Sequence, residues 1–556
     1  MNTNTLLTGT LPIVVIVSAI LTLLTSVFLL WLYRRAVVRA MSMQAGIASG
    51  PPKDVSASHA VRSGTSLVLT TIDSSSQSEI NSAGESAYHR ATQSLIQAAI
   101  AYAIGGLAYA LVLTLAWMMA AKEGFALTRF LFLFSCYSWP VVVAMSLVHP
   151  PRRRRVAIFY GAFVLLVVAI AMVRNPDITI GQLVYFWLFA NGPGTVLLGA
   201  FINRRVRAVG PIVLAFMVAA VTGSVLVVDI VGSSEGLLRG VVTVGSALSL
   251  QAATIFVLLL AIGFGFFGFL GWPLLRWLGH RYQKKRMSDQ SITLDAVWLL
   301  FGVVQTNTLV FEGWAWVFAG LVAFAAYLVT VRFGLKFFVP QSRGIAESRV
   351  LLLLRVFSLG RRSERLFDAI SNVWLRNGSI NLIAGPDLVT SMVEPHEFLN
   401  FMGGRLSRQF VQGETDLEQR VSQMDSRPDP DGRHRVNEFF CRADTWQMTM
   451  KQLARESGAV LMDLRSFSRR NQGCIYELRQ LMNSISLDRT ILVIDDTTDR
   501  AFLEMTLKEL WQELSPASPN AVLIHPIVRC FAVNQTNSAE MKKILLALFG
   551  AWKAVA

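Results

Sequence analysis

The sequence predicts an α-helical membrane domain of several spans, followed by an α/β domain built on a parallel sheet. The 556 residues are 53% hydrophobic and only 16% charged, with a mean hydropathy of +0.48, which is too apolar for a soluble globular chain. From about residue 350, long apolar runs give way to short apolar segments that alternate with amphipathic ones. Such alternation is typical of strands and helices in turn.

The amino-terminal part contains apolar stretches that can each cross a hydrocarbon layer of roughly 30 Å, for which about 20 helical residues suffice. We interpret the first as a retained anchor rather than a signal peptide, because Arg34, Arg35 and Arg39 follow its long apolar core. The chain then divides into an anchor (1–39), a Ser-rich linker (40–93) and eight further spans (94–340). The nine predicted spans are residues 12–33, 95–120, 128–148, 156–174, 180–202, 208–231, 247–272, 292–311 and 314–335.

Basic residues predict the orientation of these spans. Residues 1–340 hold 24 Lys and Arg against 11 Asp and Glu, and so most of the net charge of +15. The positive-inside rule places the amino terminus outside and both the linker and the carboxyl-terminal domain in the cytoplasm. We therefore expect a protein of the cell inner (plasma) membrane, with the lipid bilayer as partner and no nucleic acid. The basic clusters on alternate connections are Arg34–Arg39, Arg152–Arg155, Arg204–Arg207, Arg276–Arg286, and Arg332 with Lys336.

Few residues inside the spans suggest a transport pathway. Asp229 and Asp295 fall near predicted span ends, where interfacial hydration explains them. Asn191-Gly192-Pro193-Gly194 interrupts the fifth span, as either a simple kink or a broken helix that lines a cavity. The four cysteines are too widely spaced to indicate a disulfide framework or a zinc site.

Residues 345–556 predict one cytoplasmic α/β domain with a five-stranded parallel sheet, because its strands are apolar throughout and helices separate them. Residues 411–442 do not fit this alternation, and we interpret them as an insertion with a loop and an extended stretch at residues 433–440 that is compatible with a hairpin. The predicted strands are residues 350–357, 380–384, 459–464, 490–494 and 521–527, and the predicted helices are 364–375, 396–410, 445–456, 473–483, 501–514 and 539–548.

Polar loops follow the first and third predicted strands, where a doubly wound sheet binds its ligands. Both loops carry Arg and Ser, and Glu477 stands on the helix after the second, so we predict a crevice for a phosphate-bearing ligand beside a carboxylate. Structural alternatives stay open: solvated arginines, Ser363 as an N-cap, and Glu477 paired with Arg479 or Arg465. The predicted ligand-binding residues are Ser358, Gly360, Arg361, Arg362, Arg465 and Ser466.

A second acidic motif, Asp495-Asp496-Thr497-Thr498-Asp499, follows the fourth predicted strand. It has the oxygen ligands of a Mg²⁺ site, but an N-cap for the helix at Ala501 is the simpler interpretation. We predict no metal site.

Two motifs of this domain carry a resemblance to a known family. In the first, Phe357-Ser358 is followed by Arg361-Arg362-Ser363-Glu364, and the second runs from Asp463 to Leu478 and ends in Cys474-Ile475-Tyr476-Glu477-Leu478. They are similar to the first motif and the third-strand-to-helix motif of Toll/interleukin-1 receptor (TIR)-type domains, so the domain resembles that family, which is of the flavodoxin-like class. The resemblance implies that Glu477 is the catalytic residue that cleaves the nicotinamide–ribose bond of NAD.

The resemblance implies a membrane-anchored signalling or effector protein with NAD glycohydrolase activity, for which NAD is a substrate rather than a bound cofactor. We expect a homo-oligomer. Two alternatives remain: a non-enzymatic membrane sensor or scaffold that uses the α/β domain for protein interaction, and a transporter or channel with a nucleotide-sensing domain.

Overall fold

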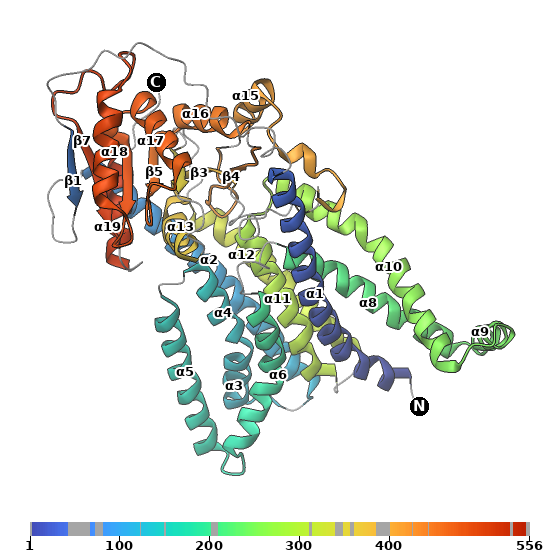
Figure 1. Cartoon of the computed structure of the whole chain (residues 1–556). Helices are drawn as coiled ribbons and strands as arrows, with labels where there is room; N and C mark the ends of the chain where they lie inside the picture. The colour runs from blue at the N-terminus through green and yellow to red at the C-terminus, as the bar shows by residue number, and fades with distance from the viewer. Residues whose placement is uncertain are drawn as a thin grey trace. The chain divides into compact units, whose positions relative to one another are not determined.

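The chain forms two compact units, each described here by itself (Figure 1). The first comprises Met1–Tyr33, Gln97–Val339 and Ser391–Met402, and the second Arg34–Ile96, Pro340–Thr390 and Gly403–Ala556. The structure is a computed structural model. It describes residues 3–42, 67–72, 82–122, 124–149, 152–201, 209–310, 314–339, 349–355, 361–384, 398, 401–424, 426–442, 444–533 and 538–551.

The first unit is a bundle of long apolar helices. In the described part of the chain, seven stretches are long and apolar enough to cross a membrane: Ile16–Met41, Ala83–Ala120, Leu127–Val148, Arg153–Arg174, Gly210–Ser233, Ala252–Gln283 and Ala319–Phe338. The bundle draws on α1 (Thr3–Ser42), α2 (Ser82–Ala120), α3 (Leu127–Tyr137), α4 (Trp139–Val148), α5 (Arg153–Arg174), α6 (Ile180–Phe201), α8 (Gly210–Ser233), α9 (Glu235–Ala247), α10 (Ala252–Gln283), α11 (Asp289–Val310), the short 3₁₀ helix Trp314–Phe318, and α12 (Ala319–Phe338).

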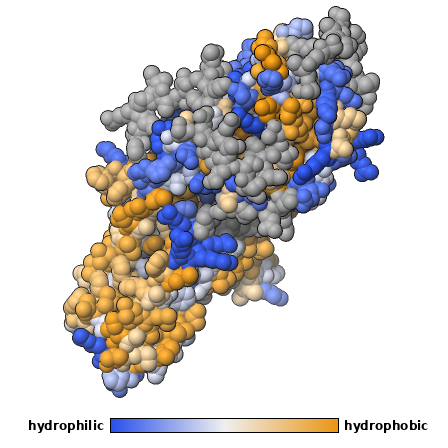
Figure 2. Space-filling model, turned by 90° about the vertical axis from the view of Figure 1, so that its left-hand side faces the viewer, coloured by the Kyte–Doolittle hydropathy of each residue, from blue (hydrophilic) through white to orange (hydrophobic). Residues whose placement is uncertain are grey.

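Hydrophobic side chains cover much of the visible surface of this bundle (Figure 2). On α5, Phe159 is 75% exposed and Val173 is 83% exposed, which would be unfavourable in water but matches the surface that a membrane helix presents to lipid. The prediction of a polytopic membrane protein is therefore confirmed in its coarse form.

Two of the nine predicted spans, now α6 and α11, lie outside the set of seven. Both are helices of 22 residues that carry polar side chains in their interior. α6 continues as one helix through Pro193, so the broken-helix interpretation of this segment is wrong.

The polar residues of α6 and α11 bond to each other inside the bundle. Gln305 Nε2 donates to Asn191 Oδ1 at 2.8 Å, and Tyr109 Oη donates to Gln305 Oε1 at 2.8 Å. Asn191 Nδ2 in turn donates to the carbonyl oxygen of Cys136 at 3.1 Å. Asn191, Gln305 and Tyr109 are all fully buried. This network links four helices (α2, α3, α6 and α11) and explains how two less apolar helices belong to the bundle.

The second unit contains a parallel sheet of seven strands in the order β1-β7-β6-β5-β2-β3-β4. The prediction of five strands is wrong, because the predicted linker supplies the edge strand β1 and the predicted insertion supplies the opposite edge strand β4. With the edge strand β4 set aside, which lies between β3 and β5 in the chain, the central order β3-β2-β5-β6-β7 matches the flavodoxin-like strand order 2-1-3-4-5. The strands are β1 (Val68–Ile72), β2 (Arg349–Arg355), β3 (Gly378–Ile383), β4 (Val436–Phe439), β5 (Ala459–Asp463), β6 (Thr490–Ile494) and β7 (Ile527–Ala532).

The last strand begins where the prediction ended it, at Ile527. The predicted strand segment before it is a turn, pinned by the buried side chain of Asn520, which donates to the carbonyl oxygens of Met482 and Ile485 at 2.7 Å each. Val522, 83% exposed, therefore lies outside the core. The prediction of one helix over 396–410 is wrong for the part that the structure describes. Phe401 and Met402 are helical, but a turn follows at Gly403 and Gly404, where Gly404 has a left-handed backbone (φ 71°), and the end forms the 3₁₀ helix Leu406–Gln409.

Helices cover both faces of the sheet (Figure 1). On one face, α16, α17 and α18 enclose a core that includes Leu352, Met462 and Leu492 from the strands. On the other face α13 packs against α19, with Trp374 stacked on Phe549 at 4.9 Å. The helices of this unit are α13 (Arg361–Trp374), α15 (Glu414–Ser422), α16 (Trp446–Glu456), α17 (Gln472–Ser484), α18 (Arg500–Gln512) and α19 (Ser538–Ala551), with the 3₁₀ helix Leu487–Arg489 before β6.

The pairing of β1 with β7 constrains the membrane topology. Strands of one sheet lie on one side of a membrane, so the chain between Ile72 and Arg349 crosses an even number of times. Six of the seven apolar stretches fall in this interval. Adding α6 and α11 gives eight, so either count satisfies the constraint.

Candidate functional site

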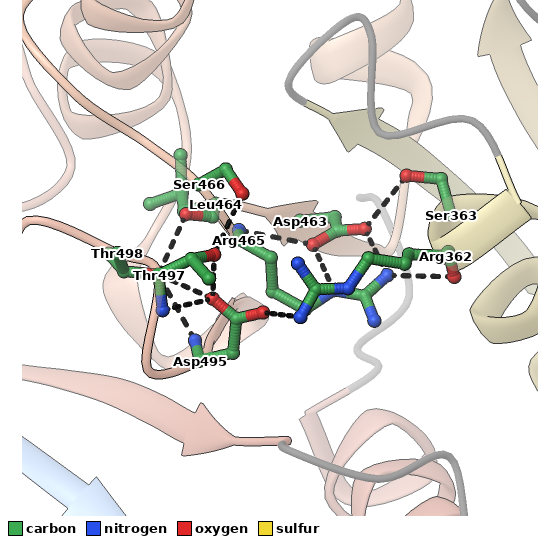
Figure 3. A network of polar contacts seen from close by, with 9 residues as sticks. All are labelled: Arg362, Ser363, Asp463, Leu464, Arg465, Ser466, Asp495, Thr497 and Thr498. Carbon is green, nitrogen blue, oxygen red and sulfur yellow. Dashed lines mark hydrogen bonds and ion pairs between the residues drawn. The ribbon is translucent and has the colours of Figure 1, made fainter.

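Three of the predicted site residues, Arg362, Arg465 and Ser466, belong to a polar network near the carboxyl ends of β5 and β6 (Figure 3). The chain order along the sheet reverses between β2 and β5, since β3 lies on one side of β2 and β5 on the other. Such a reversal is where open α/β sheets bind ligands.

Asp463, the last residue of β5, forms a buried ion pair with Arg465. Arg465 Nη2 donates to Asp463 Oδ2 at 2.7 Å, and its Nε donates to Asp463 Oδ1 at 2.8 Å. Ser363 Oγ donates to the same carboxylate at 3.2 Å, and Arg465 Nη2 also donates to the carbonyl oxygen of Arg362 at 3.1 Å. The side chains of Arg465 and Asp463 are 3% and 2% exposed. Arg465 thus ties the end of β5 to the first turn of α13.

Asp495, directly after β6, is the second buried carboxylate of this network. Arg362 reaches it from α13 at 2.8 Å, with the arginine side chain 48% and the carboxylate 1% exposed. Asp495 Oδ1 accepts hydrogen bonds from the amide and the hydroxyl of Thr497, at 3.0 and 2.6 Å. Ser466 adopts a left-handed backbone (φ 60°), and its hydroxyl lies 2.7 Å from Thr497 Oγ1. A non-glycine residue in that region stores strain, which is common beside functional sites.

Glu477 differs from both aspartates. It lies on α17 and is only 4% exposed, yet its Oε2 has no hydrogen-bond partner among the described residues. Burial raises its pKa to about 8, and the nearby charge of Arg355 opposes this only in part. Glu477 forms neither of its two predicted ion pairs. Arg465 pairs with Asp463 instead, and Arg479 pairs with Glu513 at 3.1 Å. Glu477 is thus a buried carboxyl group that is mostly protonated at neutral pH.

Cys474 lies one turn before Glu477, on the same buried face of α17. Burial, with the nearby charges of Glu477 and Asp463, raises the pKa of its thiol. A thiol in this state is a weak nucleophile. Cys474 therefore serves as a packing residue beside Glu477.

The predicted ligand-binding residues fall into two groups. Ser358 and Gly360 lie outside the described residues, and Arg361 begins α13 without a described side chain. Arg362, Arg465 and Ser466 do lie together, but their polar atoms are engaged with Asp495, Asp463 and Thr497. Their contact with a ligand stays a prediction, and for Arg465 it requires an exchange of partners.

Sequence reasoning missed Asp463, Asp495 and Thr497 as members of the site. A signal was present, because Asp463 and Asp495 each directly end a buried strand, and their strands are neighbours in the sheet. In the second acidic motif, Asp499 Oδ1 accepts from the amide of Phe502 at 3.0 Å, so the N-cap interpretation is confirmed. Within the described residues, no group of three or more His, Cys, Asp or Glu is arranged to hold a metal ion.

Comparison with known proteins adds no relative. No protein-family model matches the chain, nor does any curated protein or solved structure. The TIR-type resemblance therefore remains a prediction that rests on the two motifs.

Proposed function

We propose that this chain is a membrane-anchored signalling or effector protein whose α/β unit binds and hydrolyses NAD-like dinucleotides. One observation carries the proposal. Glu477 is a buried carboxyl group with an unpartnered oxygen, and it follows β5 at the reversal point of the sheet. An unpaired buried acid costs folding free energy, so its retention favours a role in chemistry.

The chemistry suits a carboxylate. The nicotinamide–ribose bond of NAD breaks through a state in which positive charge develops on the ribose ring. An ionised Glu477 stabilises that charge, and it accepts hydrogen bonds from the ribose hydroxyls. The cationic nicotinamide ring favours ionisation of a nearby carboxyl group, so substrate binding lowers the pKa of Glu477 toward neutral pH. The C–N bond to nicotinamide breaks and its electron pair leaves with the ring, while water forms the new C–O bond at the anomeric carbon and releases a proton to solvent. The products are nicotinamide, ADP-ribose and H⁺.

The ion pairs at the sheet edge also support the proposal. Asp463 and Asp495 are paired with Arg465 and Arg362, whereas Glu477 Oε2 has neither a hydrogen bond nor an ion pair among the described residues. The hydrogen bond between the hydroxyls of Ser466 and Thr497 joins the loop after β5 to the loop after β6, and Ser466 has a left-handed backbone there. A preorganised wall of this kind reduces the cost of ordering a ligand.

The cytoplasmic location follows from the basic clusters, and we propose it with the amino terminus outside the inner membrane. The sheet supports one part of it, since Val68–Ile72 and Ile527–Ala532 pair and so share one side. A single cysteine placed at Ser56 and one placed at the exposed Ala517, each in a chain without native cysteines, should both react with an impermeant maleimide only after the cytoplasmic side is opened. Reaction of either one from outside would contradict the proposed orientation.

The decisive experiment is nicotinamide release from NAD by the full-length protein in lipid nanodiscs. Glu477→Gln should reduce turnover at least 100-fold while the protein stays folded. Glu509→Gln, on the exposed face of α18, is the matched control and should retain full turnover. No turnover by a folded, assembled wild-type protein would defeat the proposal.

A non-enzymatic sensor or scaffold is the second candidate. The observation in its favour is that Arg362 and Arg465, the predicted phosphate ligands, are already paired with carboxylates. In that case NAD is not consumed, and Glu477→Gln leaves self-association and partner binding unchanged. The homo-oligomer is expected under both candidates, so oligomer formation does not separate them.

A further inference from the structure

The amino end of α17 is open. Its N-cap residue, Asn471, is of a type that usually caps a helix, yet its Oδ1 accepts from the amide and hydroxyl of Ser468, at 2.9 and 3.2 Å. The amides of Gln472 and Gly473 find no acceptor among the described residues. Free amides at the start of a 13-residue helix attract anions.

The surroundings of this helix end are basic and spacious. Arg469 and Arg470 precede the helix and are exposed, and its first turn contains no acidic residue. A β-carbon added to Gly473 would meet no atom within 4 Å. Asp499 lies near this loop, since its amide donates to the carbonyl oxygen of Phe467. Its carboxylate caps α18, where it accepts from the amide of Phe502, and so it is engaged away from α17.

Glu477 gives an independent sign of a ligand at this place. It lies about one helical turn after Gly473, and it is buried where Gly473 is exposed; helical side chains lean back toward the amino end of their helix. Its Oε2 is buried and without a partner among the described residues. The rise between the two positions is about 6 Å, which is of the order of the distance from a phosphate to the anomeric carbon of a ribose.

We propose that the amino end of α17 binds a phosphate of the dinucleotide through the amides of Gln472 and Gly473 and the side chain of Arg470. This subsite rests on the proposed function, because it assigns the pyrophosphate of that substrate. It places the nicotinamide ribose one helical turn further on, at Glu477. It also leaves the buried Arg465 free to keep its pair with Asp463.

The test uses the full-length protein in lipid nanodiscs with inorganic pyrophosphate, ADP and NAD as probes, measured by titration calorimetry. Gly473→Asp is the main variant, since an acid in the first turn is favourable for the helix but repels phosphate. We expect its Kd for pyrophosphate and ADP to rise at least tenfold with no fall in Tm. Arg470→Gln should weaken binding about threefold to tenfold, whereas Arg455→Gln, an exposed arginine in the last turn of α16, should not.

The outcomes separate the subsite from the activity. Tight binding of ADP that both variants weaken, without any NAD cleavage, supports the subsite and defeats the proposed function. Glu477-dependent cleavage with a KM unaffected by Gly473→Asp overturns the subsite alone. Wild-type protein that binds none of the three probes overturns it as well. If pyrophosphate binds more tightly than ADP or NAD, the site binds free phosphates, and the assignment of a dinucleotide as its ligand is overturned.

Discussion

Two polar networks of this protein differ in how fully their buried groups are partnered. One lies inside the helical bundle and the other at the carboxyl edge of the sheet. In the bundle, Asn191, Gln305 and Tyr109 form a connected chain of hydrogen bonds. At the sheet edge, Asp463 and Asp495 each form an ion pair with an arginine, Arg465 and Arg362, but Glu477 is buried and its Oε2 has no partner among the described residues. A satisfied network specifies the fold, whereas an unsatisfied acid costs stability and needs another reason to be there. The comparison therefore separates architecture from candidate chemistry.

Arg465→Ala should produce the largest loss of stability. It leaves Asp463 buried without its cation, and breaking a buried pair in this way costs about 3–5 kcal/mol. Thermal unfolding of the full-length protein, followed by the near-UV signal of the α/β unit, measures the loss. Arg470→Ala, an exposed arginine five residues on, is the control and should change the stability by less than about 0.5 kcal/mol. A small effect of Arg465→Ala would mean that the pair is not part of the architecture.

Glu477→Gln should increase the free energy of unfolding, in contrast to the loss expected for Arg465→Ala, and the increase should depend on pH. The folded pKa of about 8 exceeds the ordinary value of 4.5, so the folded state holds a proton that the unfolded state has lost between these pH values. Wild-type stability therefore falls as pH rises through this window, by at most about 1.4 kcal/mol per unit, and the glutamine variant does not share this loss.

The difference in unfolding free energy between Glu477→Gln and wild type should thus grow from pH 5 to pH 8 and then level off. Urea titrations at four pH values measure it, with Glu509→Gln as a variant for which the difference stays flat. A difference that shrinks with rising pH would place Glu477 in an ion pair instead.

Asn191→Ala should cost about 0.6–2 kcal/mol, the range for interhelical hydrogen bonds in membranes. The loss is smaller than for Arg465 because no buried charge is left behind. A double-mutant cycle with Gln305→Ala, read from unfolding in mixed micelles, tests whether the two side chains act together. Additive losses would contradict the network.

Glu513→Gln should have the smallest effect, within about 0.5 kcal/mol. Its pair with Arg479 is roughly half-exposed, with side chains 43% and 45% accessible, so solvent screens the attraction. Thermal unfolding of Glu513→Gln and Arg465→Ala under the same conditions compares the two losses of stability directly. A loss as large as that of Arg465→Ala would show that burial does not set the value of these pairs.

The sequence predicted the parts of the molecule that follow from local periodicity. Apolar length located the spans, and strand-helix alternation gave four of the five central strands and the reversal of strand order between the first and third. It placed the last strand before Ile527 instead of after it. It did not locate β1, a short strand in a polar segment. It gave β4 only as an extended stretch within an insertion, because two of the four residues of Val436–Phe439 are polar. Both are edge strands, whose pairing depends on long-range contacts that no local pattern carries.

The sequence placed Glu477 on the helix after the third predicted strand. It could not show that Glu477 Oε2 has no partner among the described residues. Arg465 and Arg479 were both open as partners in the sequence, and only the fold assigns them to Asp463 and Glu513. The same holds for Asp463 and Asp495, which the register of β5 and β6 brings together.

The most direct test of the account is a paired measurement on Glu477→Gln at about pH 7.5, just below the raised pKa of the wild-type carboxyl group. Nicotinamide release from NAD and the free energy of unfolding are measured on the same nanodisc preparation. The account predicts that turnover falls at least 100-fold while stability equals or exceeds that of the wild type. Wild-type turnover in the variant, or a loss of turnover that appears only together with a loss of stability, would contradict it.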